Sequence, residues 1–459
     1  MGRLATGERV WDLQFDEEGR LTAPDREAFI GEVGGSGVGH LFVFSHGWGT
    51  SQDHATRLYN AMFPKIRTAA QGTLSNIGFT GIYWPSLWFP PTPAKPPAGQ
   101  AAATQGAGAA VAPLDAGTAE VTGAQIAASL QPGYADPGQQ KAIAQIGALI
   151  DQGQAMAGQN APETEKQQLI TEISHLISSL TPAAADNAGA EDQGETAILT
   201  TDDPKTDYQK VASEFGTTPT GGATQGIGDW FGSAINGAKD AVRALSYWTM
   251  KTRAGTIGQT GLGPLLAALH AKYPAVQVHL IGHSFGARLV SFALAGVGAP
   301  GNSPIRSLTL LQGAFSHWSF SGATNNPFRA PGGLYQLDDR VKGPLVATFT
   351  SFDWAVGVWY PKASFLMQSN LAGAAAGPDR WGGMGADGFQ PPEAATTLSM
   401  PAGGGLAYPF VPGKTYRVDA NDVIDNTQGE SFSGAHSDIQ KMPVAQLIVA
   451  AAKAGGADG

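Results

Sequence analysis

A serine between two glycines follows a short apolar segment in the run VHLIGHSFGARLV, residues 278–290. Residues 282–286 fit the pattern G-x-S-x-G, in which the glycines allow a sharp turn from a strand into a helix and present the serine hydroxyl. Such a hydroxyl attacks an acyl carbon once a base removes its proton. Glycine-rich chains also contain this pattern by chance, so Ser284 needs a base and an acid elsewhere in the sequence.

The sequence offers a base and an acid after the serine, which is the order expected when a strand-to-helix turn carries the nucleophile. Asp353 follows the segment LVATFTSF, where a strand meets its loop, and His436 is the only histidine after Asp353. We therefore predict Ser284 as nucleophile, His436 as general base and Asp353 as the carboxylate that orients it. Other carboxylates precede the acid strand or accompany a later strand: Asp338, Asp339, Asp419, Asp422 and Asp425.

Two backbone N–H groups are needed to stabilise the oxyanion that forms during acyl transfer. Phe285 directly follows the serine at the start of a helix, where the helix dipole also favours negative charge. The sequence HGW, residues 46–48, ends an earlier apolar strand. We predict Trp48 and Phe285 as the oxyanion donors, with His46 orienting the loop; His46 as a second base is the alternative.

Aromatic residues are frequent after the predicted strands, at the edge where the substrate would bind. Part of this group belongs to the core, and the remainder would line an apolar cleft that suits an acyl or aryl group. No cluster of Lys or Arg near the motifs indicates a phosphate or carboxylate clamp. The predicted substrate-binding residues are His46, Gly47, His283, Trp84, Trp88, Trp318 and Trp354.

The elements that must position these residues alternate between strand and helix. Residues 40–45 form a buried apolar run, residues 55–63 repeat apolar side chains at helical spacing, and residues 77–86 read as a second strand ending at Pro85. The same alternation continues from residue 263 to the C-terminus, with a short, more exposed strand near residue 415. The fold class predicted is α/β, a doubly wound, mostly parallel sheet.

A long segment interrupts this alternation. Its composition is rich in Pro, Ala and Gly, but apolar residues at helical spacing within 143–150 and 169–180 predict a helical hairpin. We expect residues 87–228 to form a mainly helical cap or lid that covers the cleft.

The segment 87–228 divides the core into two parts. We expect residues 1–86 and 229–459 to form this core together, the second part carrying a Gly- and Pro-rich excursion at about 366–412.

Composition limits the function further. The 459 residues carry a formal net charge of −10 and no cysteine, which argues against nucleic-acid binding and excludes disulfides and thiolate metal sites. Scattered histidines give no metal-site pattern, and triad hydrolysis needs only water, so we expect no metal and no cofactor. The first 20 residues lack the apolar stretch of a signal peptide, and no run is long enough to span a membrane. We expect a soluble protein, either cytoplasmic or exported without a cleavable signal, with at most transient lipid-surface contact.

The order FSHGW, GHSFG, FTSFDWAVG and GAHSDI resembles the serine α/β-hydrolase superfamily, with no subfamily identified. The resemblance covers roughly residues 38–85 and 229–450 and implies an α/β-hydrolase fold with the site residues named above. It further implies hydrolysis of carboxylic esters, as in esterases and lipases, the substrate being a small molecule, a lipid or a polyester. An amidase or peptidase with the same triad, and a non-catalytic binding module, are the alternatives.

Overall fold

The computed structural model of the protein describes most of the chain. These residues are 2–4, 7–49, 51–86, 121–157, 159, 161–180, 203–214, 230–327, 329–359, 382–427 and 434–456. The predicted site residue Trp88, much of the predicted lid and the first part of the 366–412 excursion lie outside them.

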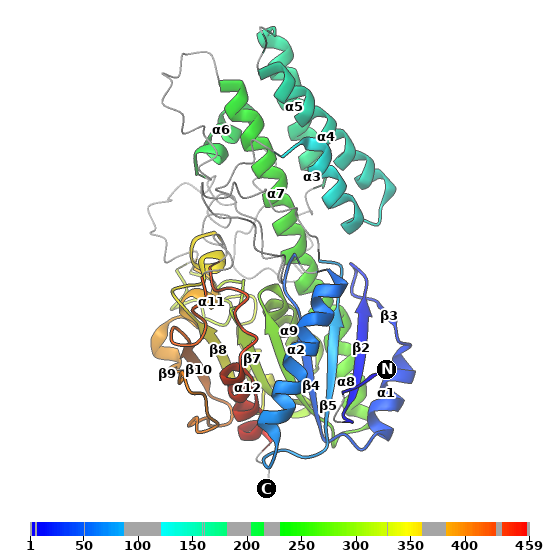
Figure 1. Ribbon diagram of the computed structural model, residues 1–459, viewed down its shortest axis with the longest axis vertical. Helices are drawn as coiled ribbons and strands as arrows, with labels where there is room; N and C mark the ends of the chain where they lie inside the picture. The colour runs from blue at the N-terminus through cyan, green and yellow to red at the C-terminus, as the bar shows by residue number, and fades with distance from the viewer. Residues whose placement is uncertain are drawn as a thin grey trace, which may run out of the picture.

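The described strands form a single ten-stranded sheet (Figure 1). The strands are β1 (Gly2–Arg3), β2 (Arg9–Phe15), β3 (Leu21–Ala23), β4 (His40–Ser45), β5 (Ile77–Tyr83), β6 (Gln277–His283), β7 (Ile305–Leu311), β8 (Leu345–Phe349), β9 (Thr396–Ser399) and β10 (Thr415–Asp419). Their order is β1-β2-β5-β4-β6-β7-β8-β10-β9, with β3 paired to β2. Only β1 and β3 run antiparallel to their neighbour, so the predicted mostly parallel α/β architecture is confirmed.

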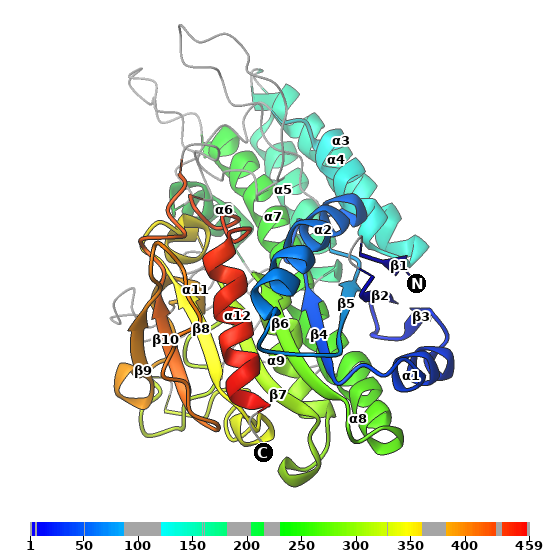
Figure 2. The ribbon, with the colours of Figure 1, turned by 60° about the horizontal axis from the view of Figure 1, so that its bottom comes forward.

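Helices cover both faces of the sheet. One face carries α2 (Gln52–Ala70) and α12 (Met442–Gly455), which pack on each other, and Figure 2 shows α12 lying across the strands. The other face carries α1 (Arg26–Gly35), α8 (Gly263–Lys272) and α9 (Phe285–Gly296). This double cover explains the sequence of β4, whose residues Leu41 to Phe44 are all buried, because a parallel strand with helices on both sides has no polar face.

The strands β1, β2 and β3 near the N-terminus, and β9, were not predicted from the sequence. The strand β9 lies within the excursion expected at 366–412 and pairs with β10 in parallel. The strand β10 is short and more exposed than β4 or β6, as predicted: only Tyr416 and Val418 are buried, and the residues between and beside them are partly exposed.

A group of helices stands above the carboxyl ends of the strands (Figure 1). These are α3 (Gly123–Leu130), α4 (Pro137–Ala157), α5 (Glu163–Leu180), α6 (Pro204–Glu214) and α7 (Trp230–Thr256). We call α3 to α6, with the part of α7 that they contact, the helical arm. The helices α4 and α5 pack on each other, as the predicted hairpin requires, whereas α3 and α6 were not anticipated.

Glycines allow two close helix contacts within the arm. A Cβ atom added at Gly123 of α3 would lie 1.9 Å from the carbonyl oxygen of Gly147 of α4, and one at Gly237 of α7 would lie 1.7 Å from that of Tyr208 of α6. Backbone therefore meets backbone at both crossings, and a side chain at either glycine would force the helices apart.

The helix α7 connects the arm to the sheet. It contacts α4, α5 and α6 as well as α9 and the π-helical turn η3 (Ile257–Leu262). Near its end, Arg253 donates to the carbonyl oxygens of Pro85 and Gly133, both at 2.7 Å, and to Glu17 Oε2 at 2.6 Å. This buried guanidinium therefore joins the exit of β5, the arm and the turn after β2 at one point.

Candidate active site

Ser284 occupies the turn between β6 and α9 in a strained backbone conformation. Its φ of 57° and ψ of −126° are rare for a residue with a side chain and cost roughly 1–3 kcal/mol. Both flanking glycines are required: a Cβ at Gly282 would lie 2.3 Å from the carbonyl oxygen of Gly286, and one at Gly286 would lie 2.2 Å from that of Ser45. The structure therefore gives residues 282–286 the tight strand-to-helix turn expected from the sequence.

Asp353 and His436 are bonded to each other inside the protein. His436 Nδ1 lies 2.8 Å from Asp353 Oδ2, and both side chains are buried. Because an ionised carboxylate only accepts hydrogen bonds, Nδ1 carries the proton and Nε2 of the neutral ring is left as the acceptor. This is the tautomer that a general base needs.

Neighbouring strands bring these two residues together. Asp353 follows β8 and His436 follows β10, and β8 and β10 are paired in parallel. An antiparallel bridge joins Asp353 to Gly434, and the backbone N–H of Ala435 donates to the carbonyl of Phe352 at 2.8 Å. Gly434 has a φ of 60°, and a Cβ there would lie 2.1 Å from that same carbonyl oxygen. The loop of the histidine is thus fixed to the loop of the carboxylate.

His283 connects His436 to the turn of Ser284. Its Nε2 lies 2.9 Å from the carbonyl oxygen of His436, and the two ring centroids are 4.8 Å apart. Since a carbonyl only accepts, His283 Nε2 carries the proton. Burial, helped by the nearby His436, lowers the pKa of His283 to about 3. His283 is therefore a neutral donor that ties the backbone of His436 to the serine turn, whereas we predicted from the sequence that it binds substrate.

The loop after β4 lies against Ser284. The strands β4 and β6 are paired with Ser45 opposite Gly282, so residues 46–48 run alongside the serine turn. A Cβ at Gly47 would lie 2.5 Å from Ser284 Cβ and 3.1 Å from Ser284 Oγ. Only glycine allows this approach, and the predicted substrate-binding Gly47 is therefore in direct reach of the serine side chain.

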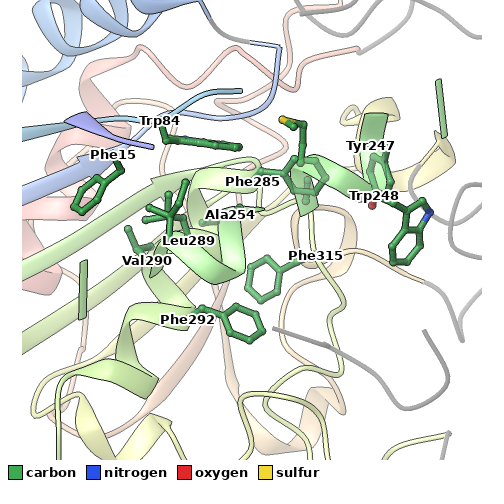
Figure 3. Close-up of a cluster of buried hydrophobic side chains, with 14 of the residues drawn as sticks. Phe15, Trp84, Tyr247, Trp248, Ala254, Phe285, Leu289, Val290, Phe292 and Phe315 are labelled. Atoms are coloured by element: carbon green, nitrogen blue, oxygen red, sulfur yellow. The ribbon is translucent and has the colours of Figure 1, made fainter. Parts of the chain in front are cut away.

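The predicted oxyanion donors, Trp48 and Phe285, flank the serine from these two loops. Their ring centroids are 5.9 Å apart, and Tyr247 of α7 packs on both, at 5.7 Å and 5.1 Å. Figure 3 shows Tyr247 and Phe285 within a cluster of buried side chains. Phe285 is the first residue of α9, so its N–H has no acceptor within the helix and lies at the positive end of the helix dipole.

His46 and Trp84 form a stacked pair beneath this loop. Their rings are 5.5 Å apart and almost parallel, and Trp84 Nε1 donates to the His46 carbonyl at 3.2 Å. His46 Nδ1 lies 2.9 Å from the carbonyl oxygen of Gly47. Burial lowers the pKa of His46 to about 4, which leaves the ring neutral. We predicted that both residues bind substrate; what the structure shows for them is support of the loop.

The remaining predicted aromatic residues are more peripheral. Trp354 adjoins Asp353 and is 37% exposed, with Gly434 packed close to its ring. Phe352, on the other side of Asp353, is 38% exposed, so the acid lies between two exposed aromatic side chains. Trp318 is partly buried and packs edge-on against His317 at 5.0 Å.

Sequence reasoning missed Gln312. This residue directly follows β7, and its side-chain Nε2 donates to Asp353 Oδ2 at 2.9 Å. The available signal was its position at the end of β7, which lies between β6, the strand before Ser284, and β8, the strand before Asp353. No known motif has a glutamine at this position.

Among the described residues, no group of three or more His, Asp or Glu side chains is arranged to hold a metal ion. None of the described helices has the length and apolar character needed to cross a membrane. Comparisons with protein-family models, curated proteins and solved structures give no match.

Proposed function

We propose that the protein is a serine hydrolase with an α/β-hydrolase fold that cleaves carboxylic esters through Ser284, His436 and Asp353. The observation that carries this proposal is the strained conformation of Ser284. A strained non-glycine residue persists only where the surrounding structure enforces it, and such residues gather at functional sites. Here the strain falls on a serine directly after His283, which is bonded to the backbone of His436, and Nδ1 of His436 is in turn bonded to a buried carboxylate.

The proposed mechanism follows from the hydrogen bonds. Ser284 Oγ attacks the acyl carbon while His436 Nε2 takes its proton, and Asp353 stabilises the resulting imidazolium. The backbone N–H groups of Trp48 and Phe285 receive the negative charge that develops on the acyl oxygen. The imidazolium then protonates the departing alkoxide, and an acyl-enzyme remains. Water, deprotonated by His436, attacks this ester and releases the acid and Ser284.

The surroundings of the serine favour an apolar ester. Phe352 and Trp354 are exposed on either side of the acid. Trp48, which packs on the buried rings of Tyr247 and Phe285, is itself partly exposed. Such a surface binds an acyl or aryl group better than a sugar or a charged peptide.

Hydrolysis of p-nitrophenyl esters of increasing acyl length, by the wild type and Ser284→Ala, tests the proposal. We expect turnover that falls at least about a thousandfold in the variant, because the nucleophile is lost. A fluorophosphonate should label the wild type at Ser284 and leave the variant unlabelled. If the wild type neither turns over any ester nor reacts with the probe, hydrolysis is excluded and the binding-module alternative takes its place. The same triad turning over anilides faster than esters would instead indicate an amidase.

A further inference from the structure

The side chain of Gln312 lies behind the Asp353–His436 pair and is completely buried. Its Nε2 lies 2.9 Å from Asp353 Oδ2 and 3.0 Å from the carbonyl oxygen of Gly385. On the opposite side of the amide, Thr348 Oγ1 donates to Gln312 Oε1 at 2.8 Å. Every polar atom of this side chain therefore has a partner inside the protein.

These partners allow only one orientation of the amide. The Asp353 carboxylate and the Gly385 carbonyl both accept hydrogen bonds, so the NH₂ group must face them and the oxygen must face Thr348. Turning the amide over would place its oxygen against two acceptors. Gln312 therefore presents a donor to Asp353 Oδ2.

The backbone of Gln312 is also constrained. Its φ is 47°, a left-handed conformation that side chains rarely adopt, and its N–H donates to Thr348 Oγ1 at 3.1 Å. The hydroxyl of Thr348 thus contacts both the backbone and the side chain of Gln312. The amide of Gln312 is held at both ends, so its direction is defined. Strained backbone conformations of this kind cluster at functional sites.

We propose that Gln312 is a positioning residue for catalysis, which fixes the Asp353 carboxylate and through it the orientation and basicity of His436. This inference rests on the proposed function of the triad. Asp353 Oδ2 receives hydrogen bonds from His436 Nδ1 and Gln312 Nε2, while Asp353 Oδ1 receives one from the Val356 N–H at 3.0 Å. With donors on both oxygens the carboxylate cannot rotate. The amide also takes up part of the carboxylate charge that would otherwise act on the imidazolium.

The test uses Gln312→Met, which keeps the length and approximate volume of the side chain and removes its donor. We expect kcat to fall about ten- to a hundredfold, because His436 loses its fixed orientation. KM should change little, because the substrate-binding site is left intact. The acid limb of kcat should move to higher pH, because a carboxylate with one donor fewer stabilises the imidazolium more strongly. A purely structural role would not produce this movement.

Thr309→Val is the matched control. Thr309 is another buried polar residue of the same strand, β7, three positions before Gln312. Since Thr309 Oγ1 has no hydrogen-bond partner among the described residues, its loss leaves no polar group unpaired. We expect kcat to stay within about twofold of the wild type and the acid limb to stay in place. An equal loss of kcat in the two variants would overturn the proposal, since it would show that any disturbance of β7 has the same effect. Unchanged kcat and an unchanged acid limb in folded Gln312→Met would overturn it as well.

A second measurement separates this inference from the proposed function. Nitrogen-15 NMR of histidine-labelled protein follows the titration of the His436 ring without any turnover, with the signal assigned by its absence in His436→Gln. If the titration midpoint of His436 lies at higher pH in Gln312→Met than in the wild type, the positioning role is supported, even if no ester is hydrolysed. If the midpoint is unchanged, the positioning role is overturned, even if esters are hydrolysed.

Discussion

The carboxyl edge of the sheet and the helical arm above it are held together by different means. At the edge, the polar side chains around Asp353 have defined partners: Asp353 Oδ2 accepts from His436 and Gln312. In the arm, isoleucines such as Ile146 and Ile173 are buried in the core, and glycines allow two helix pairs to approach backbone to backbone. Hydrogen bonds specify direction, whereas apolar packing specifies little beyond volume. Chemistry is therefore expected from the edge, and cover and stability from the arm.

The two regions meet along α7. Tyr247 of this helix packs on the rings of Trp48 and Phe285, and six residues later Arg253 joins the arm to Glu17 and Pro85. Edge and arm are thus in direct contact along α7, and we expect them to differ in what they contribute: activity from the edge and stability from the arm.

The largest expected effect belongs to the edge. Asp353→Asn should reduce kcat about 10⁴-fold, because an amide donor facing His436 favours the tautomer in which Nε2 carries the proton. The free energy of unfolding should change little in comparison. Esterase kinetics and urea unfolding of the same preparation measure both. Asp422→Asn, an exposed carboxylate of the same region, is the control and should behave as the wild type; comparable activity in the two variants would refute the role of Asp353.

The arm should show the reverse behaviour. Ile173→Ala removes a fully buried side chain of α5 and should lower the free energy of unfolding by about 2–5 kcal/mol. The kcat for a short ester, measured where the protein is folded, should stay within about twofold of the wild type. Thr171→Ala, an exposed change on the same helix, serves as the control. A large loss of kcat at full folding would mean that the arm takes part in the chemistry.

A smaller effect sharpens the description of the edge. Burial lowers the pKa of His46 to about 4 and that of His283 to about 3, so between these values and about 6.5 the unfolded chain binds more protons than the folded protein. The free energy of unfolding should therefore fall as the pH drops below about 6.5, by up to about 1.4 kcal/mol per pH unit for each histidine.

Urea unfolding between pH 7.5 and 4.5 measures this slope. In His283→Gln, which keeps a side-chain donor but cannot titrate, the slope should be smaller by the contribution of one proton. A slope identical to that of the wild type would show that His283 is charged in the folded protein or is not the group responsible.

Much of the sheet, the turn of Ser284 and the pairing of Asp353 with His436 could be predicted from the sequence. The strand β4 contains a continuous apolar run because helices cover both faces of the sheet, and the G-x-S-x-G motif predicts the turn after β6. The pairing of Asp353 with His436 followed from strand order, since parallel strands deliver their carboxyl ends to one edge.

Other features depend on contacts between distant segments. Gln312 donates hydrogen bonds to Asp353 and Gly385, which lie 41 and 73 positions later in the chain. The sequence around Gln312 gives no indication of these contacts. The strand β9 has mostly exposed residues and lies in a Gly- and Pro-rich stretch, so it has no apolar pattern to detect. The role of His283 in holding His436 was hidden because the motif accepts any residue at that position.

The bond between His283 and the carbonyl of His436 has a mechanical consequence. Proton transfer depends steeply on the separation of its donor and acceptor, and thermal motion of two independent loops would make that separation fluctuate by the sum of their displacements. Here the backbone of His436 is bonded to the residue adjoining Ser284, so we expect a displacement of one loop to be shared by the other. For the proposed reaction, the two groups would then move in a common frame of reference, and much of their motion would cancel in the distance between them.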